Sequence, residues 1–161
     1  MRIRLAVADD REAVERCVHE AYAHDVPRIG RPPLPMTADY SRLMAAGSVH
    51  VAEDDGHIVG VLVLEPEEQS LLIENVAVRP DRQGTGLGTR LLAFAEAQAR
   101  ARHLPAVRLY THELMTENQR FYRARGFVET ARRTEQGVAR VFMSKTVAPR
   151  DDSNPPRDST V

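Results

Sequence analysis

Residues 71–102 read LLIENVAVRPDRQGTGLGTRLLAFAEAQARAR, and this stretch decides the fold. It opens with an apolar, β-prone run, Leu71–Val78, which ends at Pro80 because proline has no backbone N–H to donate. Three glycines follow at alternate positions between residues 84 and 88. The leucines and alanines after them recur every three to four residues, as on one face of a helix. The stretch therefore predicts a strand, a glycine-lined turn and a helix.

The turn into this helix suits an anion. The first turn of a helix leaves backbone N–H groups unpaired and carries the positive end of the helix dipole. Glycines at 84, 86 and 88 let a phosphate approach the backbone without meeting a Cβ, and they tolerate positive φ. We therefore expect a phosphate or diphosphate ligand here, with an ordinary helix start as the alternative.

Two familiar glycine motifs do not fit the turn. A P-loop needs GxxxxGK[ST], but the only lysine of the chain is Lys145. A dinucleotide-binding turn needs GxGxxG near the start of the chain, whereas this turn reads GxGxG and follows two or three expected strands. A nucleotide-binding module is therefore disfavoured.

Two blocks of the sequence resemble one family. The first, Gln83–Gly88, fits Q/R-x-x-G-x-G/A and is similar to the acyl-CoA pyrophosphate loop of the GNAT N-acetyltransferase superfamily. The second, ENQRFYRARGF at Glu117–Phe127, resembles the later helix of that family, in which an Asn precedes a Tyr and a Gly-Phe pair begins the next strand. The resemblance covers roughly Ile3–Lys145. It implies an α/β (α+β) GNAT fold, with a mixed, mostly antiparallel sheet of six to seven strands and helices on both faces.

Composition and charge bound the class of protein. The 161 residues are 42% hydrophobic and 28% charged, which predicts one globular domain, expected at residues 1–147. The proline-rich end, residues 148–161, is expected to be a disordered tail. No run reaches the roughly 18 apolar residues of a membrane span, and the start lacks a signal-peptide core, so we expect a cytoplasmic protein that binds no membrane. The net charge of −1 argues against a nucleic-acid partner.

The distribution of charge is uneven. Eleven arginines and five acidic residues lie between Arg79 and Arg133, which gives this stretch a net charge of +6. It is either a solvated arginine-rich surface or a positive field for an anionic cosubstrate. Cys17 is a lone cysteine in a helical pattern and is expected to be structural. The six histidines fall singly, so no metal site is expected.

The N-terminal part should contain a strand, a helix, a long loop and a second helix. Alternation predicts a strand from Ile3, and Asp9-Asp10 are expected to cap the helix that follows. His24–Met36 holds four prolines and a glycine and is expected to have no regular structure. A short helix, capped by Thr37, should follow it. The loop is either a surface connector or, as the resemblance to GNAT enzymes implies, a substrate contact through the residues Tyr22, Arg28, Arg31, Met36 and Tyr40.

The remaining strands should complete a sheet. Residues 48–53 and 58–64 form a hairpin around Asp55-Gly56, and residues 128–133 and 138–143 form a second. The strand at 107–111 follows the glycine-led helix, so the right-handed βαβ rule makes it parallel to Leu71–Val78. The resemblance to the GNAT fold implies that these two strands splay at their C-terminal ends.

The resemblance to GNAT enzymes implies how acetyl-CoA would bind. The pantetheine arm would lie between the splayed strands and contact Val76, Ala77, Val78 and Asn118. The pyrophosphate would lie on the glycine turn, held by Gln83, Gly84, Gly86, Gly88 and Thr89.

Acyl transfer to an amine needs a base for the amine and an acid for the departing thiolate. The resemblance implies that Tyr122 protonates the sulfur, although Tyr122 and Asn118 are also typical of a core aromatic and a helix cap. Glu74 interrupts an apolar strand and is a candidate base, unless it faces solvent or pairs with an arginine. Tyr110, His112 and Glu113 are further candidates.

The sequence therefore predicts an acetyl-CoA-dependent N-acetyltransferase. Its acceptor would be a primary amine of a small molecule or peptide, attacking directly in a ternary complex because no activated cysteine is evident. The alternative is a non-catalytic acyl-CoA sensor or partner-binding module on the same fold. The open edges of the sheet leave room for a homodimer.

Overall fold

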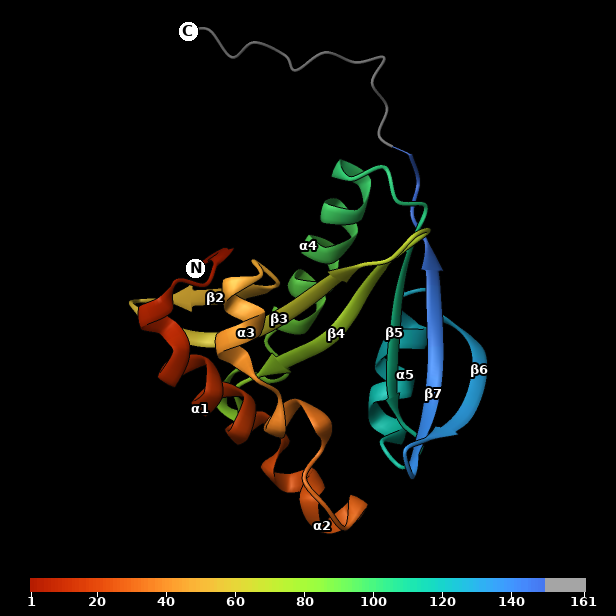
Figure 1. The fold of residues 1–161 in the computed structure, drawn as a ribbon, viewed down its shortest axis with the longest axis horizontal. Coiled ribbons are helices and arrows are strands. Elements are labelled where there is room, and N and C mark those ends of the chain that lie inside the picture. The colour runs from red at the N-terminus through yellow and green to blue at the C-terminus, as the bar shows by residue number, and fades with distance from the viewer. Residues whose placement is uncertain (150–161) are drawn as a thin grey trace, which may run out of the picture.

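The computed structural model describes residues 1–149, which form a seven-stranded sheet in the order β1-β2-β3-β4-β5-β7-β6 (Figure 1). Its strands are β1 (Arg2–Leu5), β2 (Val49–Asp54), β3 (His57–Pro66), β4 (Leu71–Val78), β5 (Ala106–His112), β6 (Val128–Glu135) and β7 (Val138–Thr146). Neighbouring strands are antiparallel except β4 and β5, which are parallel. The predicted mixed sheet is confirmed. The expected C-terminal tail lies outside the described residues from position 150 on.

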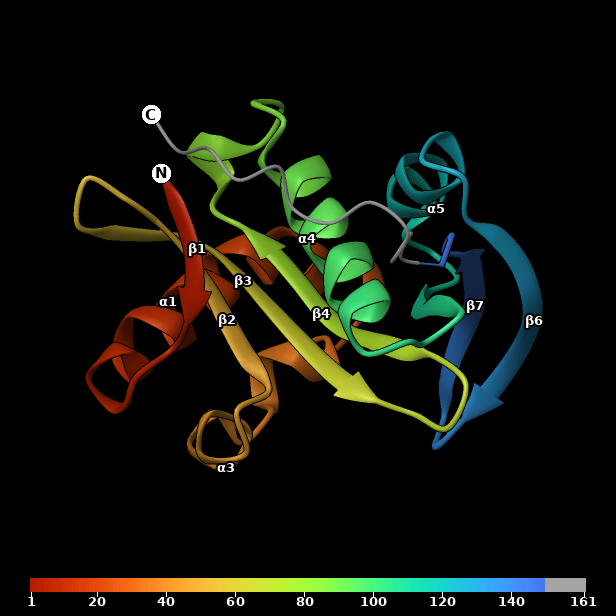
Figure 2. The same cartoon turned by 90° about the horizontal axis from the view of Figure 1, so that it is seen from above.

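Helices cover both faces of the sheet (Figure 2). They are α1 (Arg11–Tyr22), α2 (Val26–Ile29), α3 (Tyr40–Ala45), α4 (Leu87–Ala101) and α5 (Thr116–Ala124), with 3-10 turns η1 (Ala8–Asp10), η2 (Ala23–Asp25), η3 (Leu34–Thr37) and η4 (Pro80–Arg82). One core cluster packs α4 and α5 against the sheet, and a second packs α1 and α3 against the other face. Within the described residues, no helix is long and apolar enough to cross a membrane.

Both predicted hairpins are present. Asp55 and Gly56 join β2 to β3 with φ of 50° and 77°, and Gln136 and Gly137 join β6 to β7 with φ of 52° and 74°. Two consecutive residues of positive φ form the two-residue turn whose twist matches that of the flanking strands.

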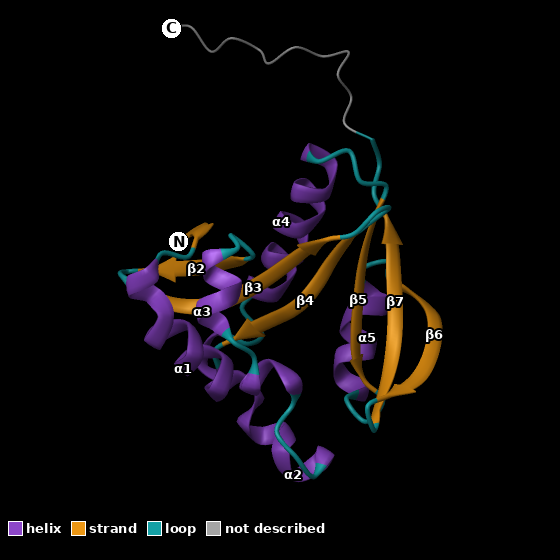
Figure 3. Cartoon of the chain, in the orientation of Figure 1, coloured by secondary structure: helices purple, strands orange, loops and turns teal. Residues whose placement is uncertain are grey.

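The long loop is more ordered than its prolines predict. Instead of lacking regular structure, residues 24–36 contain most of η2, all of α2 and part of η3 (Figure 3). Pro27 lies in the first turn of α2, where no backbone N–H is needed. Gly30 ends α2 with φ of 84°. Pro35 lies in the first turn of η3 in the same way, and Pro32 and Pro33 precede that turn, so the prolines are compatible with both helical segments.

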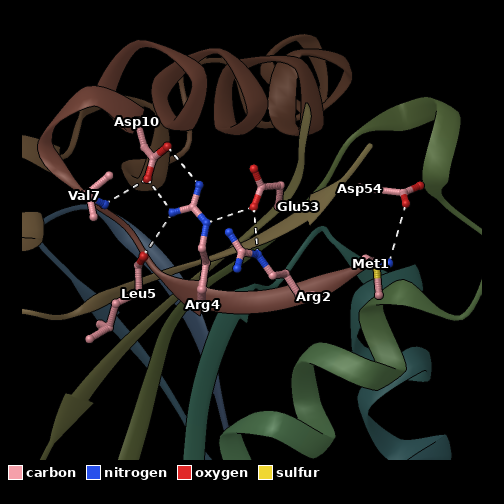
Figure 4. Close-up of polar contacts among 8 residues, drawn as sticks. All are labelled: Met1, Arg2, Arg4, Leu5, Val7, Asp10, Glu53 and Asp54. Atoms are coloured by element: carbon pink, nitrogen blue, oxygen red, sulfur yellow. Dashed lines mark hydrogen bonds and ion pairs between the residues drawn. The ribbon is translucent and has the colours of Figure 1, made fainter. Parts of the chain in front are cut away.

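Of the two predicted caps, Thr37 was wrong, and Asp10 holds the N-cap position of α1 without a capping hydrogen bond from its side chain. Thr37 lies in η3, and α3 is capped by Asp39, whose Oδ1 accepts a hydrogen bond of 3.1 Å from the Arg42 N–H. At α1, Asp10 turns back toward β1 instead of capping the helix: its Oδ2 accepts from the Val7 N–H at 2.8 Å and from Arg4 at 2.7 Å (Figure 4). The ion pair with Arg4 competes successfully for the carboxylate.

Candidate active site

The two parallel strands at the centre of the sheet separate. The last of their pairs joins Ile73 to Leu109. Beyond it, β4 continues to Val78 and β5 to His112 without pairing with each other, so the two strands form a V (Figures 1 and 3). The predicted splay is confirmed, and the unpaired strand ends line a cleft.

The cleft has two adjacent parts. The loop groove lies between the end of β4, the glycine turn and α5, and among its lining residues are Val76, Ala77, Val78, Gln83, Gly84, Gly86, Gly88, Thr89, Phe121 and Arg125. The strap pocket lies under Ala23–Thr37, a segment that we call the strap, and among its lining residues are Ile29, Arg31, Leu34, Glu74, Tyr110, His112 and Arg140. Both parts are also lined by Tyr22, Val76, Met115, Asn118 and Tyr122. All the residues predicted to bind acetyl-CoA lie in the loop groove.

A bulge in β4 forms the boundary between the two parts. Val63 of β3 pairs with Asn75 and Leu64 pairs with Ile73, so Glu74 is an additional residue on β4. Because of this residue the side-chain alternation changes face: Ile73 packs in the cluster under α4, and Ala77, four residues later, packs in the cluster under α1. Bulges of this kind re-aim side chains next to functional sites.

The peptide groups of β4 divide between β3 and the cleft. The Arg79 N–H donates to the Val59 carbonyl, so alternation turns the peptide groups of Ala77 toward β3 and those of Val76 and Val78 toward the open side. The Val76 carbonyl accepts from the Tyr22 hydroxyl at 3.0 Å, and the Val78 carbonyl from Gln83 Nε2 at 3.1 Å. Of the three predicted backbone contacts, Val76 and Val78 have peptide groups that face the cleft.

The glycine turn presents unpaired amides to the loop groove. Gly84 and Gly86 have φ of 75° and 89°, and Gly86 is the N-cap of α4. The first backbone bond of the helix runs from Arg90 to Gly86, so the N–H groups of residues 87–89 have no intrahelical acceptor. In the described part of the chain, no side chain caps this end of α4, and no atom of a more distant residue lies within 4 Å of a Cβ built on Gly84 or Gly86. The turn therefore has room and donors for an anion.

Arg125 brings a positive charge to the start of α4. Its Nε donates to Thr89 Oγ1 at 2.8 Å, and its Nη1 donates to the Phe121 carbonyl at 2.9 Å. Its Cζ lies 3.6 Å from the centroid of the Phe121 ring. Of the eleven arginines between Arg79 and Arg133, it is the one that lines the loop groove. Sequence reasoning missed it, although it directly precedes the Gly-Phe pair of the second block.

Tyr122 stands where the two parts of the cleft meet. Its ring lies edge-on to Phe121 and Phe127, at centroid distances of 5.5 and 5.9 Å. Burial raises the pKa of its phenol, so it stays protonated at neutral pH. Within residues 1–149, no group hydrogen-bonds its hydroxyl. Asn118, one helical turn earlier, borders both parts of the cleft as well.

Glu74 lines the strap pocket beside the last β4–β5 pair. Its side chain is half-buried, and it forms neither a hydrogen bond nor an ion pair with the described residues. Desolvation, and then the charge of Glu65, raise the pKa of its carboxyl, while Arg42 and Arg140 oppose the shift. A carboxylate of raised pKa in a cleft is suited to accept a proton.

The other candidate bases are less well placed. His112 lines the strap pocket, but its Nδ1 already accepts from the Leu114 N–H at 3.0 Å, and desolvation lowers its pKa. Tyr110 has a raised phenol pKa because of burial, and its ring is covered by Arg140. Glu113 is exposed and pairs with Arg132 at 3.4 Å, outside the cleft.

Two arginines tie the strap to the opposite side of the cleft. Arg28 pairs with Glu117 of α5 through contacts of 2.7 and 3.0 Å. Arg31 Nη2 donates to the Gly137 carbonyl at 2.6 Å. Both also line the cleft, Arg28 at the loop groove and Arg31 at the strap pocket. Met36, another predicted substrate contact, lines a separate hollow beside α1 instead.

A chain of hydrogen bonds holds the bulge to the strap. Two tyrosines flank the buried side-chain amide of Asn75. The Tyr22 hydroxyl lies 2.6 Å from Asn75 Oδ1, and the Tyr40 hydroxyl accepts from Asn75 Nδ2 at 3.2 Å. Tyr40 in turn donates to the Pro35 carbonyl. The predicted substrate contacts Tyr22 and Tyr40 therefore have structural partners of their own, and both also border cavities at the cleft.

A family model described as an acetyltransferase (GNAT) domain matches residues 45–129, which include the bulge, the glycine turn and α5. The chain belongs to the GNAT acetyltransferase family. Membership confirms the predicted family. A segment of 80 residues is 42% identical to the amino-acid acetyltransferase of Ralstonia nicotianae, but it spans 48% of this GNAT chain and 17% of that protein.

Solved structures of N-acetyltransferases share the fold. The PaiA N-acetyltransferase of Thermoplasma acidophilum, in complex with coenzyme A, superposes with a TM-score of 0.76 at 18% identity over 90% of this chain and 98% of its own. The ribosomal-protein-S18-alanine N-acetyltransferase of Escherichia coli gives 0.74 at 17% identity, over 96% and 98%. These likenesses confirm the GNAT fold. Within the described residues, no three His, Cys, Asp or Glu side chains are grouped as a metal site would need.

Proposed function

We propose that this protein transfers an acetyl group from acetyl-CoA to a primary amine of a small molecule or peptide. One observation carries the proposal: the two parts of the cleft meet at Tyr122. The phenol of Tyr122 is protonated at neutral pH and has no hydrogen-bond partner in the described chain. Within residues 1–149, the loop groove offers unpaired amides at the start of α4, and the strap pocket offers the unpaired carboxyl group of Glu74.

The loop groove suits the cosubstrate. The amides of residues 87–89 and the guanidinium of Arg125 would hold the pyrophosphate. The open-side peptide groups of Val76 and Val78 would bind the pantetheine arm as an added strand does, after Tyr22 and Gln83 release the two carbonyls. Asn118 would contact the pantetheine arm near the place where the loop groove meets the strap pocket. The bound thioester would then lie beside Tyr122.

The strap pocket would receive the acceptor amine. Glu74 takes a proton from the amine, directly or through a water molecule, so that the nitrogen lone pair can attack the thioester carbon. The carbon–sulfur bond breaks, and the leaving sulfur takes the proton of the Tyr122 hydroxyl. Cys17 lies in the cluster under α1, and burial raises the pKa of its thiol to about 12. A cysteine in this state favours direct attack over an acyl-cysteine intermediate.

Isothermal titration of acetyl-CoA into the full chain tests the cosubstrate. We expect binding to the wild type and its loss in Gly86→Val, which fills the groove and forces a β-branched residue to φ of 89°. Gly56→Val is the matched control, because Gly56 has φ of 77° and an equally open Cβ position but stands in the β2–β3 hairpin. Thermal melts report whether the two variants fold equally well.

Turnover is then measured as thiol release with a panel of amines and peptides, and the products are identified by mass. Acetylated amine formed in proportion to released thiol supports the proposal. A wild-type protein that binds no acetyl-CoA would remove the enzyme interpretation, and binding without transfer to any acceptor would favour a sensor.

A further inference from the structure

Arg140 is a fixed guanidinium in the wall of the strap pocket. It lies on β7 opposite His112 of β5, and its Cζ is 4.4 Å from the centroid of the Tyr110 ring. Its Nη1 donates to Glu135 Oε2 at 2.9 Å. The side chain is 14% exposed. One face and one corner of the guanidinium are therefore held by the protein, which fixes its orientation.

The other edge of this guanidinium has no hydrogen-bond partner among residues 1–149. The Nε of Arg140 is buried and makes no hydrogen bond within residues 1–149, and Nη2 makes none either. Buried polar groups in native proteins nearly always have a partner, so an unpaired N–H in the wall of a pocket is a candidate contact for an acceptor atom of a ligand. An arginine edge formed by Nε and Nη2 matches the two oxygens of a carboxylate.

The free edge lies close to the expected position of the acceptor amine. Glu74 directly follows the last β4–β5 pair, and Tyr110, on which Arg140 stacks, follows the same pair on β5. Arg140 is also near enough to Glu74 for its charge to oppose the raised pKa of that carboxyl. A small molecule in the strap pocket can therefore face both residues at once.

The charges of the strap pocket argue against a polycationic acceptor. Among its described lining residues, Glu74 is the one carboxylate, while Arg31 and Arg140 are both cationic. The rest of the wall beneath the strap is largely apolar, with Ile29, Leu34 and Val138. A second positive charge on the acceptor would meet arginines, whereas a negative charge would be matched.

We propose that the acceptor is an amine that also carries a carboxylate, such as an amino acid, and that the Nε edge of Arg140 binds this carboxylate while Glu74 faces the amine. This inference rests on the proposed acetyl transfer. It assigns Arg140 the choice of acceptor and gives it no part in the chemical step.

Matched acceptor pairs that differ only in the carboxylate test the proposal. We would compare phenylalanine with phenethylamine and leucine with 3-methylbutylamine, each with acetyl-CoA and the full-length protein. The wild type should prefer the carboxylated member of each pair by about tenfold or more in kcat/KM, the range of a charge-assisted contact. Arg140→Met should abolish the preference through KM. Arg140→Lys keeps the positive charge but loses the paired N–H donors of the guanidinium, so it should retain only part of the preference for the carboxylated acceptor.

Two controls separate this role from structural damage. Glu135→Gln removes the partner of Nη1 but leaves the free edge intact, so it should preserve the preference. Titration of acetyl-CoA should give the same affinity for all these variants, because Arg140 does not line the loop groove. Titration of phenylalanine and phenethylamine into the protein saturated with CoA measures acceptor binding without turnover.

The outcomes distinguish this inference from the proposed function. Transfer to amines with equal preference within each pair, or a preference that survives Arg140→Met, would overturn the carboxylate assignment and leave the acetyltransferase standing. Binding of phenylalanine over phenethylamine that requires Arg140, without any transfer, would uphold the carboxylate site and overturn the catalytic proposal. Neither binding nor transfer would remove both.

Discussion

The Phe121 ring lies 3.1 Å from the point that a Cβ on Gly88 would occupy, and Arg125 stacks on the same ring with its Cζ 3.6 Å from the centroid. Gly88, the third glycine of the turn, therefore has a different structural role from Gly84 and Gly86. Gly84 and Gly86 have positive φ and open space around them, whereas Gly88 lets α5 approach α4. This approach forms one wall of the loop groove.

Gly88→Ala is expected to destabilise the protein even though alanine is the better helix former. The helix gains about 1 kcal/mol from alanine, but the overpacked contact with Phe121 costs about 1–3 kcal/mol. Phe121→Leu removes the obstructing ring edge, so in that background Gly88→Ala should become stabilising. Urea unfolding of the four proteins of this double-mutant cycle gives the coupling free energy. Additive effects would show that Phe121 moves aside without cost.

Tyr122→Phe is expected to lower kcat by about 100-fold or more while the affinity for acetyl-CoA changes little, since a positioned general acid contributes at least this much. The ring would keep its edge contacts with Phe121 and Phe127, so stability should be retained. Single-turnover kinetics and calorimetry measure the two quantities. A non-catalytic sensor predicts no effect in either, and an unchanged rate would remove Tyr122 from the mechanism.

Glu74→Gln is expected to remove the acidic limb of the pH–rate profile. A base acts when it is deprotonated, so the wild-type rate should fall as the pH drops through the pKa of Glu74. Desolvation raises this pKa above its usual range, which moves the fall toward neutral pH. The variant should be about 100-fold slower at neutral pH and less dependent on pH in the acidic range. His112→Gln is the comparison: if it abolishes the acidic limb and Glu74→Gln does not, the base is His112.

The local features of the site could be predicted from the sequence because they depend on short segments. Pro80, the alternate glycines and the helical periodicity after them define one strand–turn–helix unit. The position of Tyr122 could be read from its own block in the same way. Asp55-Gly56 fixes a hairpin because both residues adopt positive φ in a turn of two residues.

The features that could not be predicted depend on contacts between distant segments. Arg31 and Gly137 are 106 residues apart, and Arg125 and Thr89 are 36 apart. No spacing rule connects such pairs. The sequence therefore presents Arg125 only as part of an arginine-rich stretch, and Arg31 only as a loop residue that contacts either solvent or substrate. The bulge at Glu74 was also missed, because it exists only in the register between β3 and β4. Its consequence, the change of face along β4, places Glu74 in the cleft.

Arg28→Met is expected to loosen the strap. The pair with Glu117 is exposed, so its loss should weaken apparent acetyl-CoA affinity by only about twofold to fivefold, and the difference should shrink at high salt. Glu117→Gln should match it, and the double variant should be no worse than either single one, since one interaction is lost in all three. Calorimetry at two salt concentrations checks this. Full additivity of the two changes would mean that the residues act separately.

Far from the cleft, Arg4 joins β1 to the start of α1 and to β2. Its Nη1 donates to Asp10 at 2.7 Å and its Nε donates to Glu53 at 3.0 Å (Figure 4). The side chains of Arg4 and Asp10 are 23% and 13% exposed, so water screens the pair only in part. The hydrogen bond from Arg4, followed by that from the Val7 N–H, lowers the pKa of Asp10 against the opposing effect of desolvation.

The lowered pKa of Asp10 predicts how the stability of the fold changes at acid pH. A carboxyl group whose pKa is lower in the folded than in the unfolded chain stabilises the fold above the unfolded value, about 3.9 for Asp, and loses this contribution as the pH falls through the folded pKa. Asp10→Asn should therefore cost about 1–2 kcal/mol at pH 7 and progressively less below pH 4. The exposed neighbour Asp9 supplies the control, Asp9→Asn, which should change the free energy of unfolding little at either pH. Urea titrations between pH 7 and pH 3 measure both, and an Asp10→Asn cost that stays constant with pH would show that the loss comes from packing around Val7 rather than from the charge on Asp10.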